Sequence, residues 1–242
     1  MIALWILLGI VGLIVLYLLF LLICSACVGK VTYQKNSKFY WWLLRTNTKL
    51  ALFILNVKPI LNGKEKLDGL GRFLFVCNHR SNLDPLITWV LLPKSDVAFL
   101  SKGANIRLPI FGRIIRKCCF LEIDRTNPRN AIKALRASSE LLKDNQVSIG
   151  VYPEGTRSMC KEMLPFHDGV FKVAQFASVP VVVAAVRGTE KVKNRKFPKR
   201  TKLYLDILDV IPVQTVKEKT SHELADYSKD LMQKFFDEFD KD

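Results

Sequence analysis

Residues 179–186 form the apolar run VPVVVAAV, in which hydrophobic side chains do not alternate with polar ones. Successive side chains of a β-strand point to opposite faces of the sheet, so a strand of this composition is buried on both faces. Strands of this kind are typical of parallel sheets whose two faces are covered by helices. The run therefore favours a layered α/β fold.

Similar apolar runs alternate with segments of helical periodicity from Gly71 onward. The expected strands are Phe73–Cys77, Val97–Leu100, Cys118–Ile123, Val147–Tyr152, Val179–Val186 and Lys202–Val210. The expected helices are Pro85–Leu92, Pro128–Leu142, Asp168–Phe176 and Thr220–Phe239. Two helix starts carry capping signals, because Asn127 precedes Pro128 and Thr220 forms a capping box with Glu223. This order predicts one α/β domain with a mainly parallel central sheet flanked by helices.

The N-terminal segment is apolar enough to enter a membrane. Residues 1–29 carry no charged side chain, and Ile2–Ile23 is long enough to cross the ~30 Å hydrocarbon core. A secretory signal peptide would also be apolar, but no positively charged segment precedes this run. Lysines follow it, and the positive-inside rule then places the rest of the chain in the cytoplasm. We expect a retained anchor in the cell membrane, either single-pass or monotopic.

A second apolar segment, residues 39–57, is interrupted by Arg45 and Lys49. The paired residues Trp41 and Trp42 beside basic side chains are typical of an amphipathic helix in the lipid headgroup layer. A helix in the core of the globular domain would show a similar pattern, and the sequence leaves both interpretations open. At helical spacing one face holds Trp42, Leu43, Leu50, Phe53, Ile54 and Val57, and another holds Arg45, Thr48, Lys49 and Asn56.

The predicted organisation has three parts. A transmembrane anchor occupies residues 1–29, an amphipathic interfacial helix with its connection occupies residues 30–60, and one globular domain occupies residues 61–242. The chain carries 37 Lys and Arg against 22 Asp and Glu, a net charge of +15. Such a charge indicates an anionic partner, such as a membrane surface, an acidic protein or nucleic acid. The six cysteines and three histidines show no zinc-ligand spacing, so we expect reduced thiols and no metal.

The stretch Asn78–Asp84, NHRSNLD, lies where a buried strand is expected to end and a helix to begin. Histidine exchanges protons near neutral pH, and a nearby carboxylate can fix its tautomer and stabilise the imidazolium. We therefore expect His79 to be a general base and Asp84 its orienting partner. Asp84 followed by Pro85 also matches a helix N-cap with a first-turn proline, and one carboxylate can serve both purposes.

A second polar stretch, Tyr152–Ser158 (YPEGTRS), follows another apolar strand. The carboxyl ends of parallel strands are where α/β sheets collect their ligands. Gly155 lets the backbone approach a ligand, Arg157 offers a planar fork suited to phosphate, and Glu154 can bind a hydroxyl or hold Arg157. Arg125, after a further strand, is a second candidate phosphate ligand. Surface turns and an exposed Asp–Arg pair use the same residue types.

These stretches together resemble the glycerolipid acyltransferases, most closely the bacterial 1-acyl-sn-glycerol-3-phosphate acyltransferases. The resemblance covers roughly residues 58–210, and the NHxSxxD and PEGTRS motifs are highly specific as a pair. Two positions depart from the family pattern: Cys119 stands where glycine is frequent, and Glu122 where an aromatic residue is usual. Glu122 bears on the shape of the pocket wall and hence on the acceptor. The matching blocks are Asn78–Asp84, Ile123–Arg125, Tyr152–Ser158 and Val179–Val181.

The resemblance implies transfer of an acyl chain from a thioester to the sn-2 hydroxyl of lysophosphatidic acid, giving phosphatidic acid in phospholipid synthesis. Acyl carrier protein or coenzyme A would carry the donor chain, and no other cofactor is implied. His79 would deprotonate the hydroxyl, and Arg125 and Arg157 would hold the acceptor phosphate. The matched positions assign catalysis to His79 and Asp84 and substrate binding to Arg125, Glu154, Gly155, Thr156 and Arg157.

The basic charge would then serve an anionic membrane and an acidic carrier protein. Three alternatives remain. The same transfer could act on another lyso-lipid. A thioesterase or lipase would need a nucleophile, but the chain has no GxSxG elbow. A non-catalytic adaptor would leave the two strand-end motifs unexplained, and a nucleic-acid partner is not expected because such a protein gains nothing from the apolar N-terminus.

Overall fold

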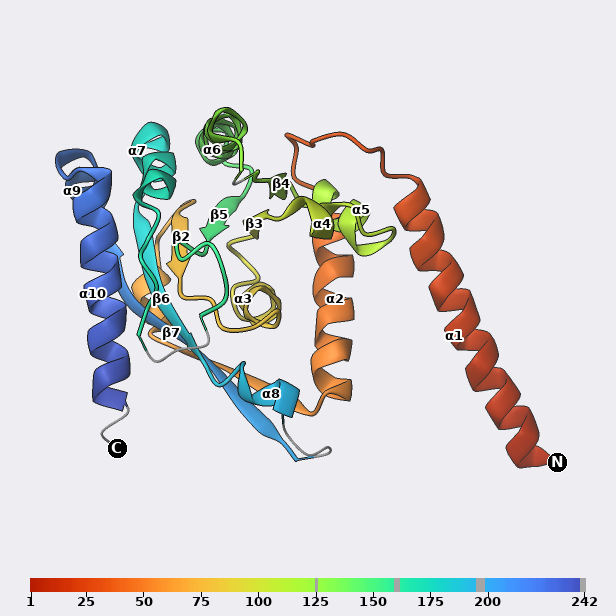
Figure 1. Cartoon of the computed structure of the whole chain (residues 1–242). Coiled ribbons are helices and arrows are strands. Elements are labelled where there is room, and N and C mark those ends of the chain that lie inside the picture. Colours follow the sequence, from red (N-terminus) through yellow and green to blue (C-terminus); the bar gives the residue numbers. More distant parts are fainter. Residues whose placement is uncertain (125, 159–161, 195–198, 240–242) are drawn as a thin grey trace.

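The computed structural model describes residues 1–124, 126–158, 162–194 and 199–239. One long helix, α1 (Ile2–Ala26), extends away from an α/β body, and the C-terminal helix α10 (Ser221–Phe239) lies on the opposite side of that body (Figure 1). Helices cover both faces of a central sheet, as the unbroken apolar strands require. The expected α/β class is confirmed.

Within the described residues, seven strands form the sheet in the order β1-β7-β6-β2-β5-β3-β4. Neighbouring strands pair in parallel except β6 and β7, which are antiparallel. The expected mainly parallel sheet is therefore confirmed. In β6, residues 181–186 are at most 1% exposed, as expected for a strand covered on both faces. The strands are β1 (Val57–Asn62), β2 (Leu74–Cys77), β3 (Val97–Ser101), β4 (Leu121–Glu122), β5 (Ser148–Val151), β6 (Val181–Arg187) and β7 (Thr201–Ile211).

Two strand predictions differ from the structure. The strand expected over residues 118–123 is limited to β4, because helix α5 (Phe111–Lys117) ends directly before that range and Cys119 has a φ of 63°. A left-handed residue cannot continue a strand. Strand β1 was not expected, yet it pairs with β7, so residues 57–60 belong to the sheet rather than only to a connection. The three-part division of the chain itself stays a prediction.

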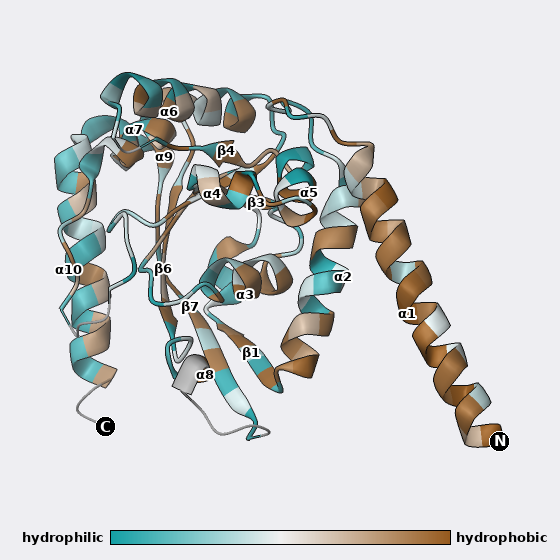
Figure 2. Ribbon diagram, turned by 45° about the vertical axis from the view of Figure 1, so that its right-hand side comes forward, coloured by the Kyte–Doolittle hydropathy of each residue, from teal (hydrophilic) through white to brown (hydrophobic). Residues whose placement is uncertain are grey.

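The helices form two layers (Figure 2). Helices α2 and α3 pack on one face of the sheet, and α6, α7 and α10 lie on the other. The helix expected over residues 168–176 occurs as a 3-10 turn, η2, followed by α7. Helices α4, α5, α8 and α9 were not expected. The bounds are η1 (Lys64–Leu67), α2 (Lys38–Ile54), α3 (Asp84–Leu91), α4 (Gly103–Ile106), α6 (Pro128–Lys143), η2 (Asp168–Phe171), α7 (Lys172–Ala177), α8 (Lys191–Asn194) and α9 (Val213–Glu218).

Both capping predictions are confirmed. The Asn127 side chain accepts hydrogen bonds from the backbone N–H groups of Arg129 and Asn130, at 3.1 and 3.3 Å, at the start of α6. Before α10, the Thr220 N–H donates to Glu223 Oε2 at 2.7 Å, and the Glu223 N–H donates to Thr220 Oγ1 at 3.2 Å. These contacts satisfy N–H groups that the helices leave without an internal partner.

Helix α1 is hydrophobic all round (Figure 2). Among the described residues it is the one helix long and apolar enough to cross a membrane. Its C-terminal end contacts the body, because the Tyr40 hydroxyl donates to the Cys24 carbonyl at 2.9 Å and Ser25 Oγ donates to the Pro109 carbonyl at 3.0 Å. The structure thus agrees with the anchor expected at residues 1–29.

Helix α2 has two apolar sides. One packs into the body and buries Trp41, Leu44, Thr48 and Leu52. The other leaves large apolar side chains exposed; Phe53 is 81% exposed. The expected division into faces is therefore wrong in part. Two residues of the face expected to hold Arg45, Thr48, Lys49 and Asn56 lie inside the fold: Thr48 is 5% exposed, and Arg45 forms an ion pair with Asp96 before β3. The position of the exposed side in a headgroup layer stays a prediction.

Candidate active site

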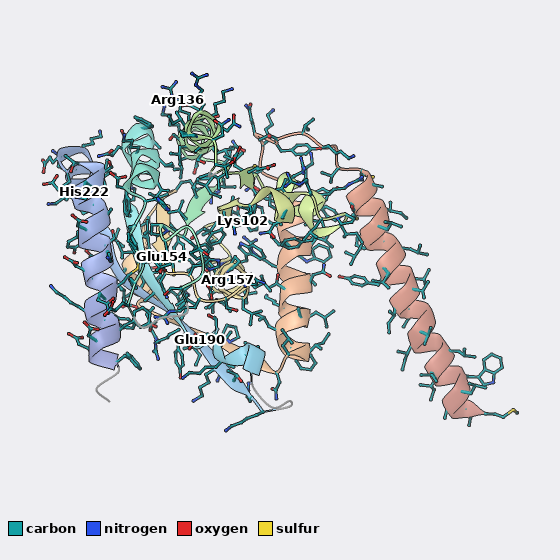
Figure 3. The ribbon with its side chains drawn as sticks, viewed as in Figure 1. Lys102, Arg136, Glu154, Arg157, Glu190 and His222 are labelled. Atoms are coloured by element: carbon teal, nitrogen blue, oxygen red, sulfur yellow. The ribbon has the colours of Figure 1, made fainter. Side chains whose placement is uncertain are left out.

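Three neighbouring parallel strands, β2, β5 and β3, end at the same edge of the sheet. The chain that leaves β2 carries His79, the chain that leaves β5 carries Arg157, and the chain that leaves β3 carries Lys102. Figure 3 shows Lys102, Glu154 and Arg157 near the middle of the molecule, whereas Arg136 and His222 lie on its outside. The topology therefore brings segments that are far apart in the sequence to one place.

His79 and Asp84 are in direct contact. His79 Nδ1 lies 2.7 Å from Asp84 Oδ2. The same oxygen accepts hydrogen bonds from the backbone N–H groups of Arg80 and Ser81, at 2.7 and 2.8 Å. An oxygen that accepts two N–H bonds acts as an ionised carboxylate, so the hydrogen in the contact belongs to Nδ1. Nε2 is then the ring nitrogen left to accept a proton.

Asp84 is not the helix cap that the sequence left open. It is the first residue of α3, and the residue before it, Leu83, makes no side-chain capping bond. The Asp84 carboxylate turns back toward the preceding loop, and Oδ1 accepts a hydrogen bond from the Thr189 hydroxyl at 2.6 Å. Asp84 is 1% exposed, and the cost of burying its charge is offset by these partners. The orienting interpretation is the one that the geometry supports.

Two buried side chains hold the loop that carries His79. The Asn78 amide donates to the Val186 carbonyl at 3.0 Å and accepts from the Val186 N–H at 2.7 Å, which fixes the end of β2 against β6. Glu154, 4% exposed, accepts from the backbone N–H of His79 at 2.9 Å and from that of Leu164 at 3.2 Å. Its carboxylate therefore joins the two sequence motifs rather than lining a cavity.

Aromatic rings support the imidazole from one side. The His79 ring stacks on Tyr152, with centroids 4.2 Å apart and 12° between the planes. Tyr152 stacks in turn on Phe99, with centroids 5.0 Å apart and 9° between the planes. Burial raises the pKa of the Tyr152 phenol well above its usual range, so this ring stays neutral. The stack limits rotation of the His79 ring and so helps to keep Nδ1 at hydrogen-bond distance from Asp84.

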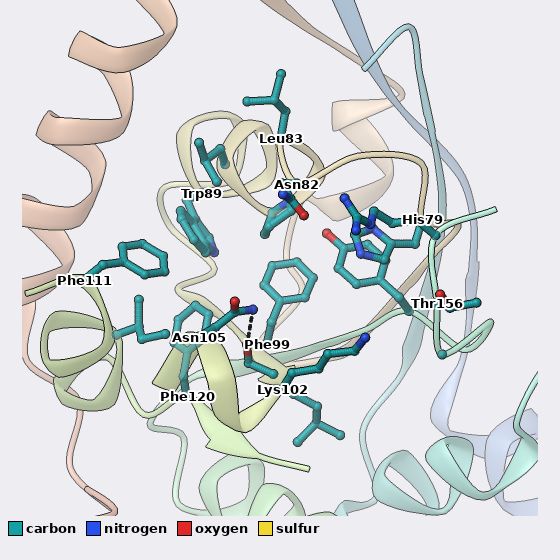
Figure 4. A pocket seen from close by; sticks show the side chains of 18 residues that line it. His79, Asn82, Leu83, Trp89, Phe99, Lys102, Asn105, Phe111, Phe120 and Thr156 are labelled. Carbon is teal, nitrogen blue, oxygen red and sulfur yellow. Dashed lines mark hydrogen bonds between the residues drawn. The ribbon is translucent and has the colours of Figure 1, made fainter. Parts of the chain in front are cut away.

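A cavity of about 540 Å³ opens beside His79 (Figure 4). Polar side chains in its wall are Asn82, Ser101, Lys102, Asn105, Thr156 and Arg157. Large apolar side chains also line it, namely Leu83, Leu86, Trp89, Phe99, Phe111, Ile115 and Phe120. A cavity with both kinds of wall suits a ligand that has a charged end and a hydrocarbon chain.

The expected binding residues fall into three groups. Gly155, Thr156 and Arg157 line the cavity, whereas Glu154 supports it from behind. Arg125 lies outside the described residues. Lys102 was not predicted, although it lines the cavity and points toward Thr156 in Figure 4. The one sequence clue to Lys102 is its position directly after β3, and that position becomes informative only when the strand order is known.

The two departures from the family pattern have local explanations. Glu122 pairs with Arg107 at 3.1 Å and does not line the cavity beside His79. Cys119 is buried with a φ of 63°, a conformation that glycine adopts without steric cost. Burial raises the pKa of the Cys119 thiol to about 11. Cys119 is a free thiol, and among the described residues no group of three or more His, Cys, Asp and Glu is placed to hold a metal ion.

Comparison with known proteins agrees with this geometry. A profile of the family described as Acyltransferase matches residues 58–187. The 1-acyl-sn-glycerol-3-phosphate acyltransferase of Salmonella typhimurium is 27% identical over 175 residues, which is 72% of this chain and 71% of that protein. The protein of the same name from Haemophilus influenzae is 28% identical over 174 residues, 72% of either chain.

A solved structure supports the fold independently. The crystal structure of the 1-acyl-sn-glycerophosphate (LPA) acyltransferase PlsC from Thermotoga maritima superposes with a TM-score of 0.70 at 23% identity. The match covers 93% of this chain and 89% of that one. Because the family profile spans more than half of the chain, the protein belongs to the acyltransferase family and is an acyltransferase.

Proposed function

We propose that the enzyme transfers an acyl chain from a thioester to the sn-2 hydroxyl of lysophosphatidic acid and so makes phosphatidic acid, with His79 as the general base. The observation that carries the proposal is the 2.7 Å contact between His79 and Asp84 at a cavity lined by both cationic and apolar side chains. The names of the similar proteins supply the substrate class.

The proposed reaction begins at Nε2 of His79. This nitrogen takes the proton of the acceptor hydroxyl while the hydroxyl oxygen attacks the thioester carbonyl carbon. Asp84, held by Thr189 and by two backbone N–H groups, stabilises the imidazolium that forms. The carbon–sulfur bond then breaks, and the thiolate takes up the proton. A thiol has a pKa of about 8.5, so it leaves without a strong acid catalyst.

The polar wall would bind the acceptor phosphate. Arg157 and Lys102 come from the ends of β5 and β3, and neither forms an ion pair within the described residues. A phosphomonoester carries roughly −1.5 to −2 charges at neutral pH, which two cations can balance. Thr156 and the backbone at Gly155 shape the loop between them. Arg125 is proposed as a further phosphate ligand from its position in the family motif.

The apolar wall would receive the donor chain. Trp89, Phe111 and Phe120 line the cavity away from the cations. Each buried methylene contributes about 0.8 kcal/mol, so the extent of this wall would set the chain length that is bound most tightly. The acyl carrier can be acyl carrier protein or coenzyme A. We place the body at the cytoplasmic face of the cell membrane, where α1 anchors it and the basic charge attracts anionic lipids.

A transfer assay tests this proposal. The full-length enzyme is reconstituted in lipid vesicles and offered lysophosphatidic acid, lysophosphatidylglycerol and lysophosphatidylethanolamine, each with both donor types. We expect phosphatidic acid to be the main product by lipid mass spectrometry. Arg157→Ala should raise KM for lysophosphatidic acid with little change in kcat, because the phosphate is bound equally in the ground and transition states. Preferred acylation of a phosphodiester lyso-lipid would favour the alternative acceptor class.

A further inference from the structure

A second cavity, of about 290 Å³, lies on the other face of the sheet. Helix α6 contributes Ala131 and Leu135 to its wall, and η2 contributes Gly169 and Val170. Most of its lining is apolar; His167, Asp168 and the Tyr152 phenol are the titratable side chains that line it within the described residues. An apolar cavity of this kind suits a hydrocarbon segment rather than a charged group.

The two cavities share lining residues at the loop between β5 and η2. Leu100, Tyr152 and Gly155 line both of them. The second cavity is therefore lined by Gly155, which has a φ of 71° and lies two residues before Arg157 in the sequence. The backbone N–H of His167 donates to the Pro153 carbonyl at 2.9 Å and fixes this loop against η2. A ligand held at Arg157 is thus two residues along the chain from a glycine that lines both cavities.

We infer that the second cavity binds the first part of the acceptor's own acyl chain. This inference rests on the proposed function, in which the acceptor is a lysophospholipid whose phosphate lies at Arg157. Such an acceptor has one chain, and the donor brings another. The larger cavity lies against His79 and takes the donor chain, so the acceptor chain requires a different apolar surface near the phosphate loop. The second cavity is such a surface.

Two substitutions can fill this cavity from different elements. Open space surrounds the position that a Cβ would take at Gly169, so Gly169→Val adds volume without a backbone clash. Ala131→Leu adds volume from α6 and keeps a good helix former. Ala137→Leu is the matched control, since Ala137 is exposed on the same helix and does not line the cavity.

The test compares 1-octanoyl- and 1-acetyl-glycerol 3-phosphate as acceptors with one fixed donor. Both are short enough to be assayed in solution, and only the former has a chain that would enter the cavity. Each filling variant should lower the ratio of kcat/KM for the octanoyl to the acetyl acceptor by about tenfold, because a mismatch of even one methylene group is discriminated about 10–200-fold. The value for the acetyl acceptor and the ratio for Ala137→Leu should stay at the wild-type level.

The other outcomes overturn the inference in distinct ways. An unchanged ratio in both variants would leave the acceptor chain outside this cavity, for example in the bilayer. Equal losses for both acceptors would indicate a distorted phosphate loop. A changed preference for donor chain length would assign the cavity to the donor. If the wild-type enzyme acylates neither acceptor although it transfers acyl chains to another alcohol, the proposed function fails instead.

Discussion

The hydroxyl of Thr189 donates a hydrogen bond to Asp84 Oδ1 at 2.6 Å, across 105 residues of sequence. Thr189 follows β6 and is completely buried, while Asp84 begins α3. The contact therefore ties the proposed catalytic pair to the end of β6, the strand that pairs with β2. It completes the set of donors around a carboxylate whose other oxygen faces His79.

Thr189 is accordingly a positioning residue, and Thr189→Val should lower kcat about tenfold while KM for both substrates stays near the wild-type value. The reason is that Asp84 loses the donor that holds its carboxylate toward His79, so the imidazolium formed in the reaction is stabilised less well. Thr189→Ser keeps the hydroxyl and should restore most of kcat. Steady-state kinetics on the three proteins check this. A purely structural role would instead lower the melting temperature of Thr189→Val and leave kcat intact.

Glu154 provides a second test. Its carboxylate accepts hydrogen bonds from two backbone N–H groups, which predicts that Glu154 contributes to the stability of the fold rather than to affinity for the acceptor. Glu154→Gln places an amide NH₂ where an N–H donor already points. We expect a loss of about 1–3 kcal/mol in the free energy of unfolding, measured by thermal or denaturant melting in detergent. A variant that melts like the wild type but has a raised KM for the lyso-lipid would support acceptor binding, which the family motif implies.

Asp84 and Glu154 show what the sequence could and could not predict. The sheet class followed from unbroken apolar runs, and β6 is buried as that pattern requires. The sequence left Asp84 between two roles, because an Asp–Pro pair has the same local pattern in both. Only the tertiary contact with Thr189 and the turn back to Arg80 distinguish them. The partners of Glu154 are equally invisible, because one of them lies 75 residues away.

The other features that the sequence did not predict correctly also depend on tertiary structure. Lys102 is one of many lysines, and its place in the cavity depends on β3 lying beside β5. β1 follows directly on a segment of helical periodicity, and its pairing with β7 joins residues 144 apart in the sequence. The strand expected from Cys118 failed because the backbone turns left-handed at Cys119, a feature that glycine in this position would have signalled.

The donor cavity yields a third prediction. Phe111, the first residue of α5, lines its apolar wall, whereas Leu108, in the connection between α4 and α5, is 46% exposed and does not. Phe111→Ala should shift the preferred donor chain by roughly two to three methylene groups toward longer chains, since each contributes about 0.8 kcal/mol. Competition between thioesters of mixed length, with products measured by mass spectrometry, checks this. The control Leu108→Ala should keep the wild-type preference, and an unchanged preference in Phe111→Ala would place the chain elsewhere.

Cys119 yields a prediction about alkaline stability. Its pKa is raised from 9.0 to about 11 in the folded protein, so folding keeps the thiol protonated. The corresponding stability is fully present below pH 9 and is lost as the pH rises through about 11. In Cys119→Gly, which also suits the φ of 63°, the fall in melting temperature between pH 9 and pH 11 should be shallower than in the wild type. Identical slopes in the two proteins would show that the Cys119 thiol does not contribute to the loss of stability between pH 9 and pH 11.

The most direct test of the central claim is the rate of acyl transfer to lysophosphatidic acid by His79→Ala at saturating donor and acceptor. The variant is compared with the wild type in the same vesicles after melting curves show that both are folded. If Nε2 of His79 removes the hydroxyl proton, kcat should fall by about 10²–10⁴-fold, the usual contribution of a general base. A folded His79→Ala enzyme that makes phosphatidic acid at the wild-type rate would contradict the account.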